Sequence, residues 1–391
     1  MTDAASDPTV PAAAPDASPP GDAPIPMLDL AAEVEALWDE IMPAVQGVLR
    51  SGQFIGGPEV DAFEAEVADR LRVRHAIGLN SGTDALILAL EALGIGPGDE
   101  VITTPFSFFA TSEAVLRLGA TPVFGDIDPV SLNLDPATVP PLITQRTRAL
   151  LPVHLFGLPV DMDALGTIAR EHDLTIVEDA AQAFGAVHSA SDKPVGAWGD
   201  LAAFSFYPTK TLGAYGDAGL LTTNDDDLAE RVRRLRTHGS RPGDKYLHDL
   251  LGHNSRLDAL QAAILRVKLR HLDHATQARR QVATWYHRHL SDLPGVELPP
   301  LHDDHVFHQF TVQVPAERLK AVREALSEAQ IAHQRFYPLA LSAQPLMADP
   351  FTPPVTGRVC ERVLSLPIHP GLREEQVERI GGVVRDGMGT G

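Results

Sequence analysis

The sequence is poor in cysteine and lysine, and it has no long apolar run. Its single cysteine among 391 residues, Cys360, excludes an internal disulfide and a metal site built from several cysteines, and it suits a reducing cytoplasm. No apolar run approaches the ~20 residues of a membrane-spanning helix, so we expect no contact with a membrane. Lysine and arginine number 32 against 52 acidic residues, giving a formal charge of −20. Such a surface repels polyanions and argues against nucleic acid as a partner.

The first 26 residues differ in composition from the rest of the chain. Residues 1–26 contain seven prolines and seven alanines but no lysine, arginine or aromatic residue. A segment of this kind buries too little apolar surface to offset the entropy lost on ordering. It also lacks the basic start and apolar centre of a signal peptide. We therefore predict a disordered tail.

From residue 27 onwards, apolar runs alternate with stretches of helical periodicity. The expected strands are 75–80, 101–104, 122–124, 149–153, 174–177, 201–206 and 220–223, and the expected helices are 84–93, 111–118, 162–172 and 228–237. This alternation predicts an α/β fold, in which a large domain over residues 27–274 holds a mainly parallel sheet flanked by helices. Ligands of such sheets bind beyond the carboxyl ends of the strands.

The C-terminal part has a different pattern. We expect a long helix over 255–274 and a second over 278–290, followed by a strand at 306–314, a helix at 316–329, a strand at 331–337 and a closing helix at 374–386. This order predicts a smaller α+β domain over residues 275–391.

Three segments carry residues suited to chemistry at that sheet edge. The first, Asn80-Ser81-Gly82-Thr83, joins a strand to a helix, where free N–H groups and hydroxyls can hold an anion. A simple N-cap and tight turn would explain the same residues.

The second segment places Glu178 and Asp179 at the end of a β-branched strand. A carboxylate there is costly to desolvate unless it meets a cation. The alternative for Asp179 is a helix N-cap.

The third segment contains Lys210, one of five lysines. Lys268 and Lys320 lie on helical stretches with charged neighbours and are expected to be solvated, and Lys193 and Lys245 lie in polar loops. Lys210 alone follows an apolar strand, where partial desolvation turns an amine into a nucleophile toward carbonyls. Pairing with Asp179 is its structural alternative.

Together these segments supply an anion cradle, an acid for a cationic ring nitrogen and a reactive amine. Pyridoxal 5'-phosphate requires this combination. The sequence also resembles the DegT/DnrJ/StrS sugar aminotransferases, which are fold-type I, aspartate aminotransferase-like enzymes. The resemblance runs from about Pro26 to the C-terminus, and it is most specific around Asp179 and Lys210. Other matching stretches are Gly56-Gly57-Pro58-Glu59-Val60, Ser81-Gly82-Thr83-Asp84-Ala85-Leu86, Gly96-Pro97-Gly98-Asp99-Glu100 and Val153-His154-Leu155-Phe156-Gly157.

The resemblance implies roles for individual residues. Lys210 would bind the cofactor covalently and then move a proton between substrate and cofactor, and Asp179 would keep the pyridine nitrogen protonated. Gln182 would contact the ring hydroxyl. Gly82, Thr83 and Ser205 would hold the phosphate, and Phe108 would stack on the ring. Spacing alone would assign Phe108 to the core.

The resemblance also implies a homodimer with shared active sites. Asn254 would reach the phosphate in the neighbouring subunit, and Arg256 would bind substrate there. In the alternative, Ser255 caps the long helix and Arg256 pairs with an acid such as Asp258. His308 and Tyr337 would also bind substrate.

Two positions depart from the family pattern, and one histidine cluster imitates a metal site. Ser342 and Phe184 stand where histidine is frequent, and both are expected near the sugar. His302-Asp303-Asp304-His305 with His308 lacks cysteine and a helical His-Glu pair, so we predict no metal.

The resemblance implies a transaminase that moves an amino group from glutamate to a keto group of a nucleotide-linked sugar. The stretch 210–217 is most similar to members that act at a 3-keto position. The alternative is a regulatory paralogue that binds pyridoxal phosphate without turnover.

Overall fold

The computed structural model describes residues 23–241 and 243–389, so residues 1–22 of the expected tail lie outside the described part. Ile25, near the end of the expected tail, is 1% exposed and bridges to Ile331. The ordered chain therefore begins before residue 27. No helix of the described residues is both long and apolar enough to cross a membrane.

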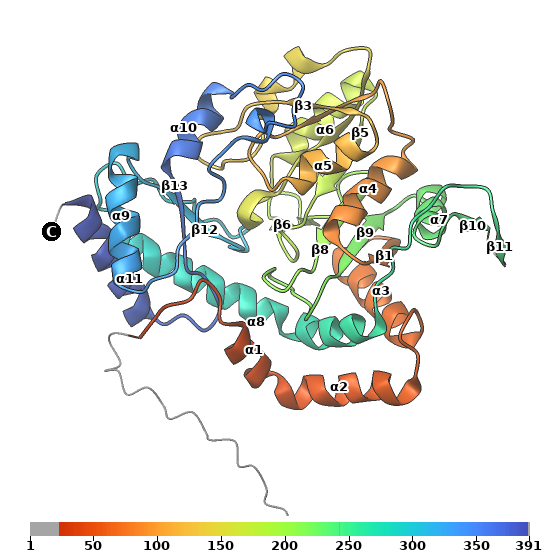
Figure 1. The fold of residues 1–391 in the computed structure, drawn as a ribbon, viewed down its shortest axis with the longest axis horizontal. Coiled ribbons are helices and arrows are strands. Elements are labelled where there is room, and N and C mark those ends of the chain that lie inside the picture. The colour runs from red at the N-terminus through yellow and green to blue at the C-terminus, as the bar shows by residue number, and fades with distance from the viewer. Residues whose placement is uncertain (1–22, 242, 390–391) are drawn as a thin grey trace, which may run out of the picture.

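A seven-stranded sheet forms the centre of the molecule (Figure 1). Its order is β1-β9-β8-β5-β4-β2-β3, and β9 alone runs against the others. The strands are β1 (His75–Leu79), β2 (Glu100–Thr103), β3 (Thr121–Phe124), β4 (Thr147–Leu151), β5 (Thr175–Asp179), β8 (Leu201–Ser205) and β9 (Gly219–Thr223). All seven expected strands of this part are present, and the predicted mainly parallel sheet is confirmed.

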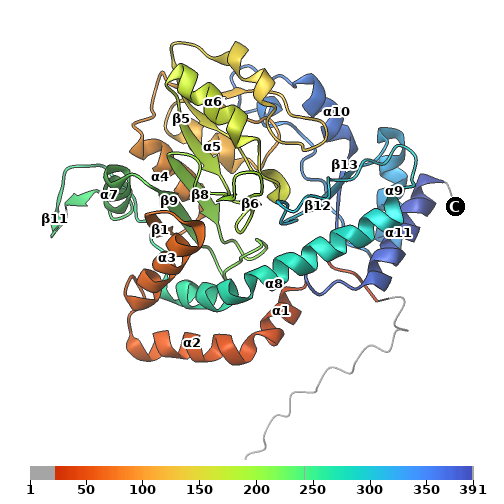
Figure 2. The same ribbon diagram turned by 180° about the vertical axis from the view of Figure 1, so that it is seen from behind.

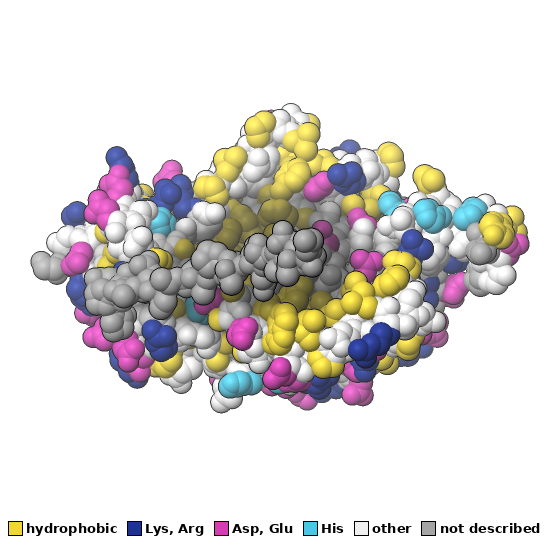
Figure 3. Space-filling view, turned by 60° about the horizontal axis from the view of Figure 1, so that its bottom comes forward, with side chains coloured by type: hydrophobic (Ala, Val, Ile, Leu, Met, Phe, Trp, Pro, Cys, Tyr) yellow, Lys and Arg dark blue, Asp and Glu magenta, His cyan; other side chains and the backbone are white. Residues whose placement is uncertain are grey.

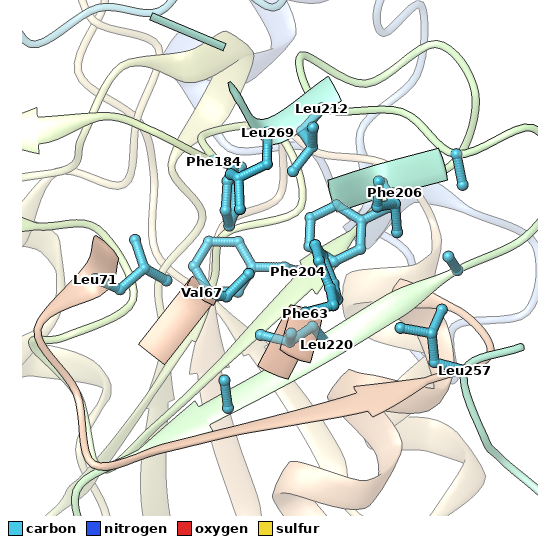
Figure 4. Close-up of a cluster of buried hydrophobic side chains, with 14 of the residues drawn as sticks. Phe63, Val67, Leu71, Phe184, Phe204, Phe206, Leu212, Leu220, Leu257 and Leu269 are labelled. Atoms are coloured by element: carbon cyan, nitrogen blue, oxygen red, sulfur yellow. The ribbon is translucent and has the colours of Figure 1, made fainter. Parts of the chain in front are cut away.

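Helices cover both faces of this sheet. One face packs against α4 (Gly82–Ala92), α5 (Ala110–Arg117) and α7 (Asp226–Leu235), and the other packs against α3 (Pro58–Leu71), α6 (Met162–His172) and α8 (Ala259–Leu290). Figure 2 shows the molecule from behind, with α6 and α3 toward the viewer. Alternate residues of each strand point into opposite cores. On β8, for example, Phe204 lies in the core drawn in Figure 4, between the sheet and α3 and α8, whereas Ala203 lies in the core between the sheet and α4.

Short elements complete the large part of the chain. At the N-terminus lie α1 (Leu30–Ala36) and α2 (Trp38–Ser51), and two small ribbons are formed by β6 (Val187–His188) with β7 (Lys193–Pro194) and by β10 (Ser240–Arg241) with β11 (Asp244–His248). The 3₁₀ turns are Pro136–Thr138, Pro140–Leu142, Leu155–Gly157 and Leu341–Ala343.

The C-terminal part confirms some expected elements and corrects others. It contains β12 (Phe310–Gln313), α9 (Ala316–Glu328), α10 (Pro354–Arg362), β13 (Val363–Leu366) and α11 (Glu374–Met388). The expected strand at 306–314 is shorter because Phe307 has a φ of 48°, which interrupts the extended backbone. The expected strand at 331–337 is wrong, since that segment meets β13 only at Gln334.

The two helices expected at 255–274 and 278–290 are one helix, α8. Residues 275–277 contain neither glycine nor proline, so nothing stops the helix there. Residue 274, the expected end of the large domain, therefore lies within a continuous helix. This helix packs on α2 and α3 at its start and on α11 further along.

Candidate functional site

A cavity of about 530 Å³ opens at the edge where the parallel strands end. It receives residues that follow β1, β2, β5 and β8, together with residues of the C-terminal part. Of the eleven residues predicted for the site, nine line this cavity: Gly82, Thr83, Phe108, Asp179, Gln182, Ser205, Lys210, His308 and Tyr337. Residues spread over some 250 positions of sequence are thus brought together by the strand order.

The predicted anion cradle lies where α4 begins. Ser81 caps this helix, because its Oγ accepts a hydrogen bond from the N–H of Asp84 at 3.1 Å. A Cβ placed on Gly82 would lie 2.6 Å from the Cβ of Ser205, so only glycine permits this approach of the two strand ends. The Ser205 hydroxyl accepts from the N–H of Tyr207 at 3.3 Å, which leaves its own proton available for an anion.

Asp179 is buried beside two hydrogen-bond donors. The hydroxyl of Thr111 donates to Oδ2 at 2.8 Å, and the N–H of Ala181 donates to Oδ1 at 3.2 Å. Burial nevertheless raises the pKa of the Asp179 carboxyl above its ordinary value. Turns rather than a helix follow it, so the N-cap alternative is wrong. A cationic group placed against this carboxylate would offset its desolvation.

Lys210 lies in the turn after β8, with its side chain in the same cavity. Burial lowers the pKa of its amine to about 8, and the negative charge of Asp179 opposes this shift only in part. Lys210 forms no ion pair within 4 Å in the part of the chain that the structure describes. The alternative of a lysine paired with Asp179 is therefore wrong, and the amine is available to a ligand.

Gln182 and Tyr337 are joined across the cavity wall. Nε2 of Gln182 donates to the Tyr337 hydroxyl at 3.1 Å, while its Oε1 accepts from the N–H of Phe156 at 2.8 Å. Burial raises the pKa of Tyr337, so its hydroxyl stays protonated. The second amide proton of Gln182 remains available to a ligand.

His308 and Phe108 lie on other walls of the cavity. Nδ1 of His308 is buried without a hydrogen-bond partner, and burial, with the nearby charge of Lys210, holds its pKa well below the ordinary value. This imidazole is neutral. Phe108 is 60% exposed, so its assignment to the core is wrong; Phe106, two residues earlier, is fully buried instead.

Asn254 and Arg256 do not line the cavity of their own chain. Between them, Ser255 donates a hydrogen bond from Oγ to Oδ1 of Asn80 at 2.9 Å, which ties this segment to the anion cradle. Ser255 does not cap α8, because Asp258 occupies the N-cap position. Among the described residues no acid pairs with Arg256, so that alternative is wrong as well.

Several cavity residues were missed by the sequence analysis. They are mainly hydroxyl and amide side chains near the predicted ones: Ser107, Thr111, Tyr207, Thr209 and Gln309, with the acid Asp217. The hydroxyls of Ser107 and Thr111 are hydrogen-bonded at 3.0 Å, and the Thr111 hydroxyl donates in turn to the Asp179 carboxylate. The sequence signal that could have identified Ser107 and Thr111 is a pair of hydroxyl residues four positions apart at the start of α5.

The two departures from the family pattern are core positions rather than site positions. Ser342 is buried and does not line the cavity. Figure 4 shows Phe184 among the apolar side chains of one core, with its ring 5.3 Å from those of Phe204 and Phe206. Neither side chain therefore lines the cavity that contains Lys210.

The histidine cluster is arranged for packing. His305 stacks on Phe307 with ring centroids 3.8 Å apart, and burial lowers its pKa to about 3. The Asp304 carboxylate accepts from the N–H of Ser189 at 2.9 Å. Within residues 23–241 and 243–389, no group of three or more acidic, histidine or cysteine side chains is placed to hold a metal ion.

This geometry can be compared with known proteins. The model of the DegT/DnrJ/EryC1/StrS aminotransferase family matches residues 36–385. The chain belongs to this family. The predicted resemblance is thereby confirmed over nearly the whole described chain.

Individual relatives are similar over almost their full length. A "pleiotropic regulatory protein" of Geobacillus stearothermophilus is 47% identical, covering 91% of this chain and 96% of that protein. A UDP-N-acetyl-3-dehydro-alpha-D-glucosamine 3-aminotransferase of Acidithiobacillus ferrooxidans is also 47% identical, covering 92% and 97%. The crystal structure of DesV from Streptomyces venezuelae, in complex with a ketimine intermediate, superimposes with a TM-score of 0.88 at 46% identity, covering 93% of this chain and 98% of that one. The predicted fold class is confirmed.

Proposed function

We propose that this protein is a pyridoxal-phosphate-dependent aminotransferase that moves an amino group from glutamate to the 3-keto group of a nucleotide-linked sugar. One observation carries the proposal. A partly buried amine, a buried carboxylate and an anion cradle, from Lys210, Asp179 and Gly82 with Ser205, converge in one cavity. A scaffold protein has no need of a lysine whose pKa is lowered to about 8.

The residues present suit the cofactor. A phosphate fits the N-terminus of α4, where Gly82 and Thr83 offer N–H groups without intrahelical acceptors and Ser205 offers a hydroxyl proton. The Asp179 carboxylate would accept a hydrogen bond from the protonated pyridinium nitrogen, whose positive charge would offset the desolvation of the carboxylate. Phe108, exposed at the cavity wall, offers a ring face for stacking.

When bound, pyridoxal phosphate supplies an electron sink for the carbon that bears the transferred nitrogen. Lys210 would hold the cofactor through its amine and would move a proton at the carbon that bears the transferred nitrogen. Its lowered pKa keeps a useful fraction of the amine neutral near neutral pH. Neutral His308 and the protonated Tyr337 hydroxyl offer hydrogen bonds to sugar hydroxyls without adding charge.

In the proposed assembly, two copies of the chain share their active sites. Large apolar side chains are exposed around the N-terminal helices and the hairpin of β10 and β11, among them Trp38, Phe54, Ile55, Tyr246 and Leu251. Figure 3 shows apolar side chains gathered around a central hollow on one face. A partner covering these residues would bring Asn254 to the neighbour's phosphate site and Arg256 to its substrate. In this organisation residues 27–274 bind the cofactor, residues 275–391 complete the cavity, and the dimer works in the cytoplasm.

A second candidate function is regulation without turnover, because one relative is called a pleiotropic regulatory protein. The cavity of this chain argues against it. A protein that only bound the cofactor would need the cradle and Lys210 to hold it, but not the buried Asp179 that would keep a pyridinium nitrogen protonated as an electron sink.

The test is spectroscopic. We expect glutamate to convert the bound cofactor of the purified holoenzyme from its lysine-attached to its amine form, and 3-keto sugars linked to uridine or thymidine diphosphate to reverse the change. The matched 4-keto sugars test the position of amination. Lys210→Ala should lose the absorbance of the attached cofactor and remain folded. A wild-type spectrum that glutamate and other amino donors leave unchanged would overturn the proposal in favour of the regulatory function.

A further inference from the structure

A second cavity, of about 620 Å³, lies behind the turn that carries Lys210. It is enclosed by α1, the start of α2, the turn over residues 208–212, the middle of α8 and the loop after Ile368. Figures 1 and 2 both place α1 beneath the middle of α8. Lys210 lines this cavity and the cavity of the proposed active site. We propose that this rear cavity binds a carboxylate of the amino donor through Arg279, an inference that rests on the proposed function.

The rear cavity contains a buried cation without an anionic partner. Arg279 is 5% exposed, and its Nη1 donates to the carbonyl oxygens of Phe307 and Ile368 at 3.3 and 2.8 Å. Its Nε is buried without a hydrogen bond, and no acid of the described chain lies within 4 Å of the guanidinium. Two neutral carbonyl groups do not neutralise a buried charge, which is costly unless an anion pairs with it.

A second buried cation lines the same cavity. Lys268, expected to be solvated, is only 6% exposed; its ammonium pairs with Glu33 of α1 and lies 5.0 Å from the centre of the Tyr215 ring. The other nearby acids are already engaged. Glu40 pairs with Arg270 and His271, and Asp29 accepts from the N–H of Ala32. Lys268 is thus paired with Glu33, whereas Arg279 has no acid within 4 Å in the described part of the chain.

The donor is the anion that the chemistry supplies at this place. The site cavity offers no lysine or arginine other than Lys210 among its described lining residues, while Asp179 and Asp217 add negative charge to it. Glutamate has two carboxylates, and its amine must react beside Lys210. Because Lys210 lines both cavities, a donor carboxylate in the proposed binding mode extends past Lys210 toward Nη2 of Arg279. Arg256 is assigned to the acceptor by the proposed function, so the two substrates have separate cations.

The test compares Arg279→Gln with Arg288→Gln in the holoenzyme. Both arginines lie on α8, but Arg288 is at the surface, paired with Glu374. We expect Arg279→Gln to raise the half-saturating glutamate concentration at least tenfold while the bound-cofactor spectrum and the keto-sugar half-reaction stay unchanged. Arg279→Lys should recover part of the loss, and Arg288→Gln should match the wild type. Glutamate dependence within twofold of wild type in Arg279→Gln would overturn the inference.

Two further measurements decide the question if Arg279→Gln does not fold. Glutarate, which has both carboxylates but no amine, should bind the wild-type holoenzyme in calorimetry and compete with glutamate; absence of competition overturns the inference. Glu33→Gln removes the acid that pairs with Lys268 and should lower the half-saturating glutamate concentration severalfold; an increase overturns the inference. If no amino donor changes the cofactor spectrum, the proposed function fails, whereas glutarate binding that Arg279→Gln abolishes would still establish the carboxylate site.

Discussion

His154 and Glu178 form a fully buried pair, with Nε2 of His154 at 3.0 Å from a carboxylate oxygen of Glu178. The N–H of Val160 donates to Nδ1 of His154 at 3.2 Å, so Nε2 carries the hydrogen and donates a hydrogen bond to Glu178. The carboxylate also accepts the backbone N–H groups of Gly196, Trp198 and Gly199. Burial alone would raise the pKa of Glu178, but His154 and these N–H groups outweigh it and hold the pKa below its ordinary value. The pair anchors the end of β5, one residue before Asp179.

Glu178→Ala is expected to lower the free energy of unfolding by about 3–5 kcal/mol, because it leaves His154 and three N–H groups buried without an acceptor. Chemical denaturation of the apoprotein measures this loss. The half-exposed Glu374, paired with Arg288, is the control, and Glu374→Ala should cost at most about 1 kcal/mol. Since the folded-state pKa of Glu178 is lowered, its contribution is present above the ordinary value of 4.5 and is lost as the pH falls. Equal losses in the two variants would contradict the proposed anchor.

Thr111→Val should impair cofactor function without unfolding the protein. It removes the O–H that donates to Asp179, and burial then raises the pKa of this carboxyl further. The carboxyl group is then more readily protonated and loses the hydroxyl that orients it, so we expect roughly a tenfold loss of kcat, equivalent to about 1.4 kcal/mol. Thr111→Ser keeps the hydroxyl and should keep most activity. Steady-state kinetics and titration with the cofactor measure the effect. If the substitutions only destabilised the fold, the apoproteins of Thr111→Val and Thr111→Ser would lose stability to the same extent.

Gly82→Ala should weaken cofactor binding at least tenfold, because its Cβ would lie 2.6 Å from the Cβ of Ser205 and push the cradle apart. Gly47 in α2 is the matched control, with no atom within 4 Å of an added Cβ. Gly47→Ala should leave affinity unchanged and stabilise the helix by roughly 0.5–1 kcal/mol. Titration of apoenzyme with pyridoxal phosphate provides the comparison, and equal affinities for both variants would rule out a phosphate site between Gly82 and Ser205.

The attachment of cofactor to Lys210 should depend on pH with a midpoint near 8. Only the neutral amine is a nucleophile, and burial lowers the pKa of Lys210 from 10.5 to about 8. We expect the attachment rate of apoenzyme to rise with pH through 8 and then to level off. Rapid-mixing absorbance measures the rate, with Lys210→Arg as the unreactive control. A rate that still rises steeply above pH 9 would show an ordinary, solvated lysine.

The proposed sharing of active sites between two copies of the chain predicts complementation between two inactive variants. Lys210→Ala and Asn254→Ala should each be inactive or nearly so, but coexpressed chains should recover about one quarter of wild-type activity. The reason is that half of randomly formed dimers are hybrids and each hybrid has one intact site. Activity of tagged, separated hybrids is the measurement. Hybrids as inactive as their parents would place Asn254 in the site of its own chain.

The sheet and the convergence of the site could be predicted from sequence for a physical reason. Apolar strands and amphipathic helices alternate, and parallel strands place their carboxyl ends together, so Asn80, Asp179 and Lys210 had to approach one another. Residues whose role depends on a distant partner could not be placed in this way. Lys268 has charged neighbours on its helix, and its burial depends on Glu33, which is 235 positions away.

Backbone details outside the sheet were predicted less well because weak local signals decide them. No residue at 275–277 forbids helix, yet none requires it, and the continuity of α8 follows from packing along its whole length. The end of the expected strand at 331–337 is likewise a tertiary effect, since Phe336 and Tyr337 turn toward the cavity instead of continuing beside β13.

The unbroken run of α8 has a mechanical consequence. Its 32 residues span about 48 Å at 1.5 Å per residue. Near one end Leu265 packs in the core beneath the sheet, and near the other Tyr286 packs among the C-terminal strands. A rotation of the sheet relative to the C-terminal part would therefore have to bend α8. Admission of a bulky sugar nucleotide must therefore rely on the loops around the cavity mouth, so stiffness of this helix sets how far the two halves of the chain can part.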